Sequence, residues 1–374
     1  MELKKYKLGD CVEILDNIRV PLSSNQRTSL KKIYPYYGAQ GIIDYVDNYL
    51  FDGDYVLVAE DGNNLKSRNE PIALWASGKF WVNNHAHILG AKEGFNLRYL
   101  FYAINQTDIK GYVSGSAQPK LNQDNLKKIE IVLPPFPYQR KIASVLSSLD
   151  RKIALNRVIN QNLEALAKQL YDYWFVQFDF PDENGKPYKS SGGKMVWNEK
   201  LKREIPEGWE VVNYKELFTI GNGKTIPQID GLIPAYGGNG VVKNVGESNY
   251  DSCIIIGRVG ANCGSIHYSK VPCWVSDNAI AVCPIIDSWL PYLYYSLKLF
   301  NLAKGKGGSS QPLITHMSLK ELYFPISKRV VEKYVSIANN LQDMIYSSQI
   351  EIQQLTKQRD ELLPLLMNGQ VTVE

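Results

Sequence analysis

The chain contains the same pattern twice, and this internal repeat limits its possible folds more than any other feature. Residues 34–46 (YPYYGAQGIIDYV) match residues 233–245 (IPAYGGNGVVKNV), and in both a second Gly precedes two β-branched residues. Two further matches follow in the same order, 80–89 with 273–282 and 115–126 with 308–319. The second copy lacks a few residues between positions 245 and 274. A repeat of this length predicts two copies of one folding unit.

Each copy is followed by a long stretch with helical periodicity. The first runs from Pro137 to Phe175 and the second from Lys328 to Gly369, with inward positions separated alternately by four and three residues, as in a coiled coil. A helix of about 38 residues is roughly 57 Å long, longer than one small domain needs. We therefore expect the two helices to pair; the alternative is two unrelated amphipathic helices that each cover their own domain. The expected seam is Leu149, Ile153, Asn156, Asn160, Leu163, Ala167, Leu170 and Trp174 with Leu341, Ile345, Ser348, Ile352, Leu355, Arg359, Leu362 and Leu366.

Composition narrows the class of protein. The 374 residues are 44% apolar and 21% charged, no run of about 18 apolar residues occurs, and the N-terminal residues lack the apolar stretch of a signal peptide. These features, with an odd number of cysteines (5), predict a cytoplasmic protein without a membrane span. The net charge of +4 is only mildly basic, so a nucleic-acid partner would need part of its phosphate contacts from another subunit.

The pattern of short elements predicts an α+β unit dominated by antiparallel sheet. In the first copy we expect a short helix in residues 6–15, strands at 55–59, 72–75 and 81–89, a helix at 95–105, and a strand that ends at the prolines of LPPF. In the second copy we expect strands at 254–256 and 274–283 and a helix at 290–300. Residues 176–209 are rich in Gly, Pro, Ser and charge, which is typical of a linker. The predicted boundaries are 1–136 for the first domain, 137–178 for the central helix, 179–209 for the linker, 210–327 for the second domain and 328–374 for the distal helix.

The strings that resemble catalytic motifs are all incomplete. GNGKT at 221–225 lacks the first Gly of a phosphate-binding loop and is followed by Pro227. LPPF at 133–136 has Leu where an adenine methyltransferase loop needs Asp or Asn to accept a hydrogen bond. Pro181-Asp182 is not followed by the further acidic residue and Lys of a nuclease. The cysteines at 253, 263, 273 and 283 recur every ten residues, unlike zinc ligands, so we expect them to pack in strands.

Three stretches resemble the specificity subunit of type I restriction-modification systems. They are LPPFPYQRKIASVLSSLDRKI at 133–153, YDYWFVQFDF at 171–180 and GGKMVWNEKLKREIPEGWEV at 192–211. The resemblance covers essentially the whole chain. It implies two tandem α/β target-recognition domains, separated by two long helices that pair as an antiparallel coiled coil. Each domain would read one half of a split site in double-stranded DNA.

The resemblance also implies partners. Two adenine methyltransferase subunits would dock on the helices, and restriction and translocase subunits would complete the complex. S-adenosylmethionine, ATP and Mg would bind to those partners, so we expect no cofactor and no active site on this chain. The first copy departs from the second by residues inserted near 63–70, which leaves open which loop meets the bases there. The rival interpretation is a two-domain scaffold or lectin-like binding protein in which the coiled coil only pairs its domains.

Two similar loops carry the first group of candidate DNA contacts. Their Gly, hydroxyl, amide and basic residues suit phosphates and base edges. The alternative is a turn that only fixes the sheet, since Gly and Pro favour turns. Because both copies keep Ser and Gln, we assign the group to positioning of the DNA rather than readout. It comprises Ser116, Gln118 and Lys120 in the first copy and Lys304, Lys306, Ser309 and Gln311 in the second.

Residues that differ between matched positions form the second group, because units that read different sequences need different side chains. This group comprises Asn83, Asn84, His85 and His87 against Ser276, Asp277 and Asn278, with Ile280 opposite His87. Side chains alternate along a strand, so half of them would instead face the core. Tyr37 with Gln40, and Tyr236 with Asn239, lie in Gly-flanked loops that would approach a groove. Lys66 and Arg258 are candidate contacts to guanine or phosphate.

Overall fold

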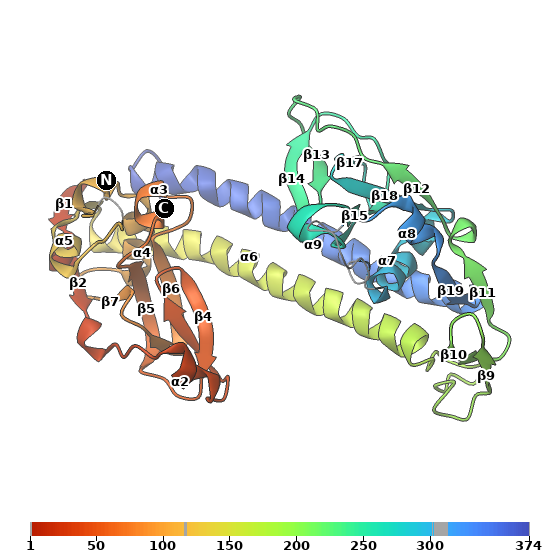
Figure 1. Ribbon diagram of the computed structural model, residues 1–374. Coiled ribbons are helices and arrows are strands. Elements are labelled where there is room, and N and C mark those ends of the chain that lie inside the picture. Colours follow the sequence, from red (N-terminus) through yellow and green to blue (C-terminus); the bar gives the residue numbers. More distant parts are fainter. Residues whose placement is uncertain (1, 116–117, 301, 303–312, 374) are drawn as a thin grey trace. The chain divides into compact units, whose positions relative to one another are not determined.

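The computed structural model describes residues 2–115, 118–300, 302 and 313–373. The chain forms two compact units: unit 1 comprises Met1–Leu155 with Glu351–Glu374, and unit 2 comprises Asn156–Ile350. Each unit contains one copy of the repeat. Helices α6 (Phe136–Tyr171) and α9 (Lys328–Met367) are continuous, and each contributes one part to unit 1 and one part to unit 2 (Figure 1).

Unit 1 is built on a six-stranded sheet. Its strand order is β2 (Val12–Ile14), β7 (Ala86–Ala91), β5 (Phe51–Ala59), β6 (Ala73–Val82), β3 (Tyr34–Gly38) and β4 (Gly41–Val46). All neighbours are antiparallel except β3 and β6. A separate ladder joins β1 (Lys4–Lys7) to β8 (Glu130–Leu133). The helices are α1 (Leu8–Cys11), α2 (Ser24–Thr28), α3 (Asn64–Ser67), α4 (Leu97–Gln106) and α5 (Gln123–Lys128), with 3-10 turns η1 (Asp16–Ile18) and η2 (Lys110–Tyr112).

The core of unit 1 lies between the sheet and α4. Consecutive residues 56–59 of β5 are buried, as expected for a central strand covered on both faces. Asn96 begins α4 by accepting a hydrogen bond from the Tyr99 amide, which satisfies one free N–H of the first turn. Leu366 and Met367 from α9 pack in the same core. Unit 1 is therefore completed by residues from the far end of the chain.

Unit 2 repeats this plan with the sheet divided in two. The four-stranded part has the order β12 (Phe218–Asn222), β18 (Ala279–Pro284), β15 (Cys253–Gly257) and β16 (Ile266–Ser269), and the three-stranded part has the order β14 (Gly240–Val245), β13 (Ile233–Gly237) and β17 (Trp274–Val275). A further ladder joins β11 (Glu210–Asn213) to β19 (Tyr323–Ile326). The helices are α7 (Leu290–Leu299) and α8 (His316–Lys320), with 3-10 turns η4 (Tyr214–Glu216), η5 (Gly260–Asn262) and η6 (Asp287–Trp289).

The two sheets match in register as well as in order. The β3–β4 hairpin has its bulge between Tyr36 and Tyr37, and the β13–β14 hairpin has its bulge between Ala235 and Tyr236. The following parallel pair is Tyr36 with Trp81 in unit 1 and Ala235 with Trp274 in unit 2. Helix α3 lies within the predicted insertion, and unit 2 has no helix between β15 and β16 apart from the short turn η5. The repeat seen in the sequence is thus a repeat of backbone structure.

Two predicted strands are each interrupted by a turn. Residues 81–89 contain the end of β6 and the start of β7, and residues 274–283 contain β17 and most of β18. In the first turn the Asn83 side chain accepts a hydrogen bond from the His85 amide (2.8 Å), and in the second the Ala279 amide donates to the Ser276 carbonyl (3.0 Å). Buried residues on both sides of each turn make the apolar pattern look continuous. The helix expected in residues 6–15 is limited to α1, between β1 and β2.

The segment expected to be a linker is folded. It contains the hairpin of β9 (Met195–Asn198) and β10 (Arg203–Pro206), and it places Phe178 and Phe180 in the core of unit 2. Phe180 stacks on Tyr188 with ring centroids 4.8 Å apart. Gly185 and Gly192 of this segment lie in turns, whereas Arg203, Glu204 and Pro206 lie in β10, so the segment is part of unit 2 rather than the linker that its composition indicated.

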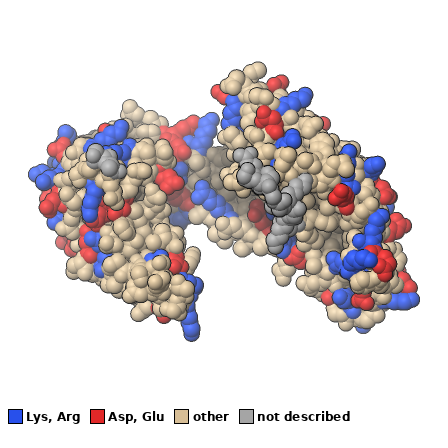
Figure 2. Space-filling model, in the orientation of Figure 1, with Lys and Arg blue, Asp and Glu red and all other residues tan. Residues whose placement is uncertain are grey.

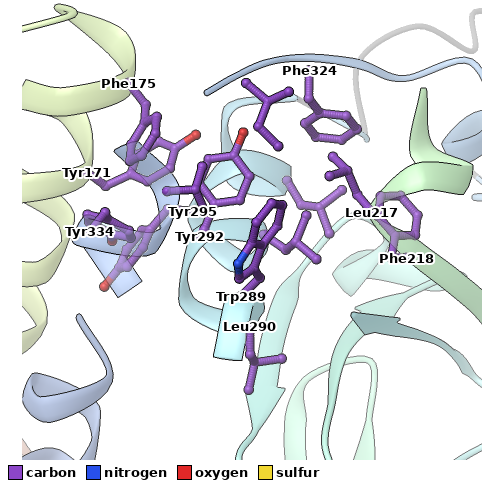
Figure 3. Close-up of a cluster of buried hydrophobic side chains, with 14 of the residues drawn as sticks. Tyr171, Phe175, Leu217, Phe218, Trp289, Leu290, Tyr292, Tyr295, Phe324 and Tyr334 are labelled. Carbon is purple, nitrogen blue, oxygen red and sulfur yellow. The ribbon is translucent and has the colours of Figure 1, made fainter. Parts of the chain in front are cut away.

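Aromatic side chains dominate the core of unit 2. Figure 3 shows Tyr171 and Phe175 from the end of the first long helix facing Tyr292 and Tyr295 of α7, with Tyr334 of α9 beside them. The Tyr171 hydroxyl is hydrogen-bonded to the Ser296 hydroxyl at 2.9 Å, so this buried group is satisfied. Burial raises the pKa of Tyr171 well above its ordinary value. The predicted helix 137–175 is confirmed, except that its last turn, η3 (Asp172–Val176), is π-helical.

The predicted helix seam is confirmed by burial. Every described seam position is buried or half-buried, from Leu149 to Trp174 in the first helix and from Leu341 to Leu366 in the second. In unit 1 Arg359 pairs with Asp150 (3.0 Å) and Glu351 pairs with Lys152, and in unit 2 the Ser348 hydroxyl donates to the Asn156 carbonyl (3.4 Å). As the residue numbers of these contacts increase along α6, the residue numbers of their partners on α9 decrease. The helices therefore pair antiparallel within each unit.

Candidate nucleic-acid interface

Four loops of unit 1 meet at the ends of β3, β5 and β6. We define the unit 1 loop cluster as the described residues 38–41, 60–66, 83–85, 114–115 and 118–121. The Gly62 amide donates to the Pro119 carbonyl (3.2 Å), and the Leu121 amide donates to the Glu60 carbonyl (2.8 Å). The Lys66 ammonium donates to the Gly115 carbonyl at 2.7 Å. These bonds fix the loops to one another, so their exposed side chains form one surface.

The 114–120 loop is closed on itself. Ser114 and Lys120 exchange two backbone hydrogen bonds of 2.8 Å each. Gly115 lies between them with φ of 82°, and a Cβ added there would lie 2.2 Å from the Gln118 carbonyl oxygen. A residue with a side chain is thus excluded at position 115. This rigidity supports a structural role for the GS-x-QP motif, while Gln118 and Lys120 keep their own side chains exposed.

A buried charge network lies behind these loops. His87 is 1% exposed; its Nδ1 lies 2.6 Å from Asp16 Oδ2, and its Nε2 lies 2.8 Å from the Leu121 carbonyl. Arg19 donates to Glu60 Oε2 at 2.8 Å and to the Ala86 carbonyl at 2.9 Å. The network connects the start of the unit to β5, β7 and the 114–121 loop.

The network sets the charges of its two carboxylates. Burial raises the pKa of Asp16, but the hydrogen bond and charge of His87, the Ile88 amide and Arg19 outweigh it, so the pKa lies below its ordinary value. Burial likewise opposes ionisation of Glu60, and Arg19, His87 and Lys120 outweigh it in the same direction. Both groups are therefore carboxylates at neutral pH. Sequence comparison singled out His87 but not its pairing with Asp16, Arg19 and Glu60, because these residues come from distant segments.

Two residues predicted to read bases in unit 1 are buried, and Tyr37, which was expected to approach a groove, is half-buried. His87 belongs to the buried network, and Asn83 is 6% exposed with its side chain engaged in the turn before β7. Tyr37 packs its ring edge-on against Phe80 at 5.5 Å, and burial raises its pKa. His87 lies on β7, where residues 86–89 are all buried, so neither face of this strand is open to a ligand. His87 and Asn83 are structural, and the half-buried Tyr37 ring is held against Phe80.

The other predicted residues of unit 1 lie at the surface. Gln40, Lys66, Asn84, His85, Gln118 and Lys120 are all exposed members of the loop cluster. His85 Nδ1 lies 2.6 Å from Asp61 Oδ2, and the His85 side chain remains 50% exposed. An imidazole held in this way presents its other ring nitrogen to solvent. The divergent positions 84 and 85 are thus placed where a ligand can meet them.

Unit 2 builds a matching cluster. We define it as residues 237–240, 257–265, 276–278 and 313–314. The Ser265 hydroxyl donates to the Gly238 carbonyl, and the Arg258 amide donates to the Asn278 carbonyl at 3.1 Å. A Cβ on Gly257 would lie 2.5 Å from the Asn262 carbonyl oxygen, so only Gly allows this approach.

The predicted residues of unit 2 divide in the same way as those of unit 1. Asn239, Asp277 and Asn278 are exposed, and Arg258 is half-buried. Ser276 is 2% exposed and belongs to the interior, and Tyr236 is half-buried, with its pKa raised by that burial. The remaining predicted residues, Ser116, Lys304, Lys306, Ser309 and Gln311, lie outside the described residues.

Charge on the visible surface is mixed. Figure 2 shows basic and acidic side chains interspersed on both units, with no continuous basic face on the side that is drawn. In the described part of the chain, no three His, Cys, Asp or Glu side chains are placed to hold a metal ion. Cys253 and Cys273 pack in the apolar cluster of β15 and β17, in agreement with the role expected for them. Among the described helices, none is long and apolar enough to cross a membrane.

The long helices carry exposed apolar side chains outside the seam. On α6 these are Leu155, Val158, Ile159 and Leu166, of which Leu155 is 59% exposed, and on α9 they include Ile337 and Met344. Residues 155, 159 and 166 follow helical spacing and share one face of α6. The seam positions are occupied by helix pairing, so a further protein would meet this exposed face rather than the seam.

Comparison with known proteins identifies the chain's relatives. A family model described as the type I restriction modification DNA specificity domain matches residues 1–165 and 206–358, most of the chain. The specificity subunit of the type I restriction enzyme MjaIX from Methanocaldococcus jannaschii is 28% identical over 84% of this chain and 78% of its own. The specificity subunit of the type I restriction enzyme HindI from Haemophilus influenzae is 24% identical over 68% and 71%. The crystal structure of a type I restriction-modification S subunit from M. genitalium has the same fold, with a TM-score of 0.70 over 98% of this chain and 96% of that one, at 19% identity.

Proposed function

The chain belongs to the family of type I restriction-modification DNA specificity subunits, and we propose that its two loop clusters each read one half of a split site in double-stranded DNA. The observation that carries this proposal is the repeated cluster itself. Both units hold it with the same backbone hydrogen bonds, and both place different exposed side chains on it, Asn84 and His85 against Asp277 and Asn278. A common scaffold with divergent side chains suits two readers of different sequences.

The proposal assigns the chemistry to other subunits. The catalytic strings are incomplete, and a non-catalytic subunit of this family has no need of them. Adenine methyltransferase subunits, two for each specificity subunit, would bind S-adenosylmethionine, and restriction and translocase subunits would use ATP and Mg. The complex would act in the cytoplasm. Mixed surface charge favours this division, because the methyltransferase subunits would then supply part of the phosphate contacts.

The exposed face of α6 is the proposed docking site for a methyltransferase subunit. Leu155, Ile159 and Leu166 offer exposed apolar side chains on one face of the helix, and interfaces bury such side chains at their centre. Ile159→Asp combined with Leu166→Asp should abolish co-purification with the methyltransferase subunit. Gln161→Asp, an exposed polar position on the same helix, is the matched control and should co-purify normally. Normal co-purification of the double variant would exclude this face as the docking site.

Methylation mapping tests the proposed function directly. The chain is co-expressed with its methyltransferase subunit, and modified adenines are mapped across a whole genome. The expected motif has two defined segments separated by an undefined gap, and it should disappear when the chain is omitted. The isolated chain should bind DNA weakly and with little sequence preference, because its net charge is only +4. A continuous motif, or nanomolar site-specific binding by the isolated chain at physiological salt, would contradict the proposal.

A further inference from the structure

The ends of β5 and β15 share one backbone arrangement but carry opposite charges. The Glu60 amide donates to the His85 carbonyl (2.9 Å), and its carbonyl accepts from the Leu121 amide (2.8 Å). In unit 2 the Arg258 amide donates to the Asn278 carbonyl (3.1 Å), and its carbonyl accepts from the Ile314 amide (3.0 Å). Glu60 and Arg258 therefore occupy the same position of the repeated fold.

A second matched position lies directly across from the first. Isolated antiparallel bridges join Asp61 to Lys120 in unit 1 and Val259 to Leu313 in unit 2. Lys120 and Leu313 are therefore equivalent, and both are exposed. Unit 1 combines an acid on the strand end with a base on the loop, whereas unit 2 combines a base on the strand end with an apolar residue on the loop.

In unit 1 the acid does not cancel the base. The two oxygens of Glu60 are divided: Oε2 accepts from Arg19 at 2.8 Å, and Oε1 lies 3.2 Å from the Lys120 ammonium. Arg19 is 15% exposed, is also held by the Ala86 carbonyl and lies 3.5 Å from Asp16, so its charge is shared between Glu60 and Asp16 inside the unit. The Lys120 side chain is 54% exposed and keeps its positive charge at the surface.

Each unit thus presents one cation at this place, on the loop in unit 1 and on the strand end in unit 2. In unit 2 the Arg258 guanidinium makes no hydrogen bond or ion pair with any residue that the structure describes, which leaves its donors available. The neighbouring side chains at 84 and 85 differ from those at 277 and 278. A cation that is kept while its neighbours diverge suits the part of DNA that is the same in every sequence, the phosphate backbone.

We propose that the Lys120 ammonium and the Arg258 guanidinium make the same phosphate contact, one in each unit, and that Glu60 is the residue that positions Lys120 for it. This inference rests on the proposed function in DNA recognition and assigns roles within it. Glu60 acts through Lys120 and does not itself meet the DNA, since its side chain is only 14% exposed and both of its oxygens are engaged.

Moving the cation within unit 2 tests the shared contact. The complete methyltransferase complex is assembled with each variant, and its affinity for the mapped site is measured against salt concentration. Arg258→Gln should weaken binding about tenfold and reduce the salt slope by about one, with the methylated motif unchanged. Adding Leu313→Lys should return affinity to within about threefold of the original and restore the slope. Failure of Leu313→Lys to restore either quantity would overturn the proposed equivalence.

A double-variant cycle tests the positioning role in unit 1. Lys120→Met should weaken binding and reduce the slope as Arg258→Gln does. If only net charge mattered, Glu60→Gln would strengthen DNA binding, because it removes a negative charge. If Glu60 positions Lys120, Glu60→Gln should weaken DNA binding. In the Lys120→Met background Glu60→Gln should have no further effect. An equal loss in both backgrounds would instead mean that Glu60 only supports the fold, and would overturn the assignment.

A matched control distinguishes the contacts of Lys120 and Arg258 from the effect of removing any exposed positive charge. Lys5 is 75% exposed, lies 3.5 Å from Glu130 and belongs to the β1–β8 ladder. Lys5→Met should leave the salt slope unchanged. A slope that also falls in Lys5→Met, or that stays unchanged in Lys120→Met, would overturn the proposal. A complex without substitutions that shows no methylation dependent on this chain is a different result. That result would contradict the proposed function and not this inference.

Discussion

The Nδ1 atom of His87 lies 2.6 Å from Oδ2 of Asp16, and both side chains are buried in unit 1. This contact joins residues that are far apart in the sequence, and it connects the turn after β2 with β7. Since Nε2 of the same ring faces the Leu121 carbonyl, the contact also supports the 114–121 loop. His87, which comparison of the two copies predicted to read bases, is thus a buried residue that supports the loop next to the candidate DNA-binding surface.

Replacing His87 should destabilise unit 1. His87→Leu removes one partner from the Asp16 carboxylate, which keeps the Ile88 amide and Arg19, and removes the ring partner of the Leu121 carbonyl. Loss of such a buried hydrogen bond to a charged group costs about 2–3 kcal/mol. Denaturant unfolding should show this loss, and hydrogen exchange should become faster at residues 114–121. His85→Gln, which alters an ion pair at the surface, is the control and should cost less than about 1 kcal/mol. A His87→Leu protein of full stability with an altered half-site would show that His87 reads DNA after all.

The carboxylates of the network predict how stability depends on pH. The pKa values of Asp16 and Glu60 lie below their ordinary values of 3.8 and 4.5 in the folded protein. Their contribution is therefore fully present above the ordinary values and is lost as pH falls through the lowered ones. The double variant Asp16→Asn/Glu60→Gln should be less stable than the original near neutral pH, and the difference should shrink below about pH 4. Asp52→Asn, at an exposed site on β5, should give no such trend; a gap that stays constant into acid would contradict the prediction.

Exchange of one unit should change one half of the recognised site. Residues 1–136 are replaced by those of a relative with a different target, and methylation is mapped. Leu366 and Met367 of α9 pack in the core of unit 1, so the exchanged unit must keep an apolar surface for them. The expected motif keeps the half-site of unit 2 and acquires a new one for unit 1. A change in both halves at once would contradict the two-reader proposal.

Lengthening both helices should lengthen the undefined gap in the recognised site. One heptad inserted after Leu155 and another after Ile350 adds about 10.5 Å to each helix and keeps the seam in phase. At about 3.4 Å per base pair, the gap should grow by about three base pairs, while both half-sites keep their sequence. Insertion into α6 alone shifts the seam and should reduce stability. A gap of unchanged length in a fully active double insertion would show that the helices do not set the distance.

Elements were predicted correctly where their sequence pattern lies within one segment of the chain. The long helices and their seam were predicted because a four-three pattern repeats within one segment. The β15 strand and helices α4 and α7 were predicted because their apolar patterns also lie within one short segment. The turns at 83–85 and 276–278 were missed, because buried residues on both sides continue the apolar pattern. The hairpin β9–β10 was missed because its composition resembles that of a linker, although Phe178 and Phe180 supply its packing.

Part of the candidate site was predicted from positions at which the two copies differ. Comparison of the repeats found the exposed positions 84, 85, 277 and 278, since divergence between copies is visible in the sequence. The same comparison grouped His87 with these positions, because sequence alone does not distinguish a surface residue that differs between the copies from a buried residue that differs between them. Arg19 and Glu60 were missed, since their pairing depends on a fold that brings distant segments together.

The contribution of α9 to unit 1 has a consequence for biosynthesis. Unit 2 is one continuous segment, 156–350, so all of its residues have been synthesised before residues 351–373 are added. Unit 1 begins at the other end of the chain, yet its core includes Leu366 and Met367. The N-terminal half of the nascent protein must therefore wait, with part of its apolar surface uncovered, until the last helix is synthesised. A premature stop after residue 350 would harm the first unit to be translated rather than the second.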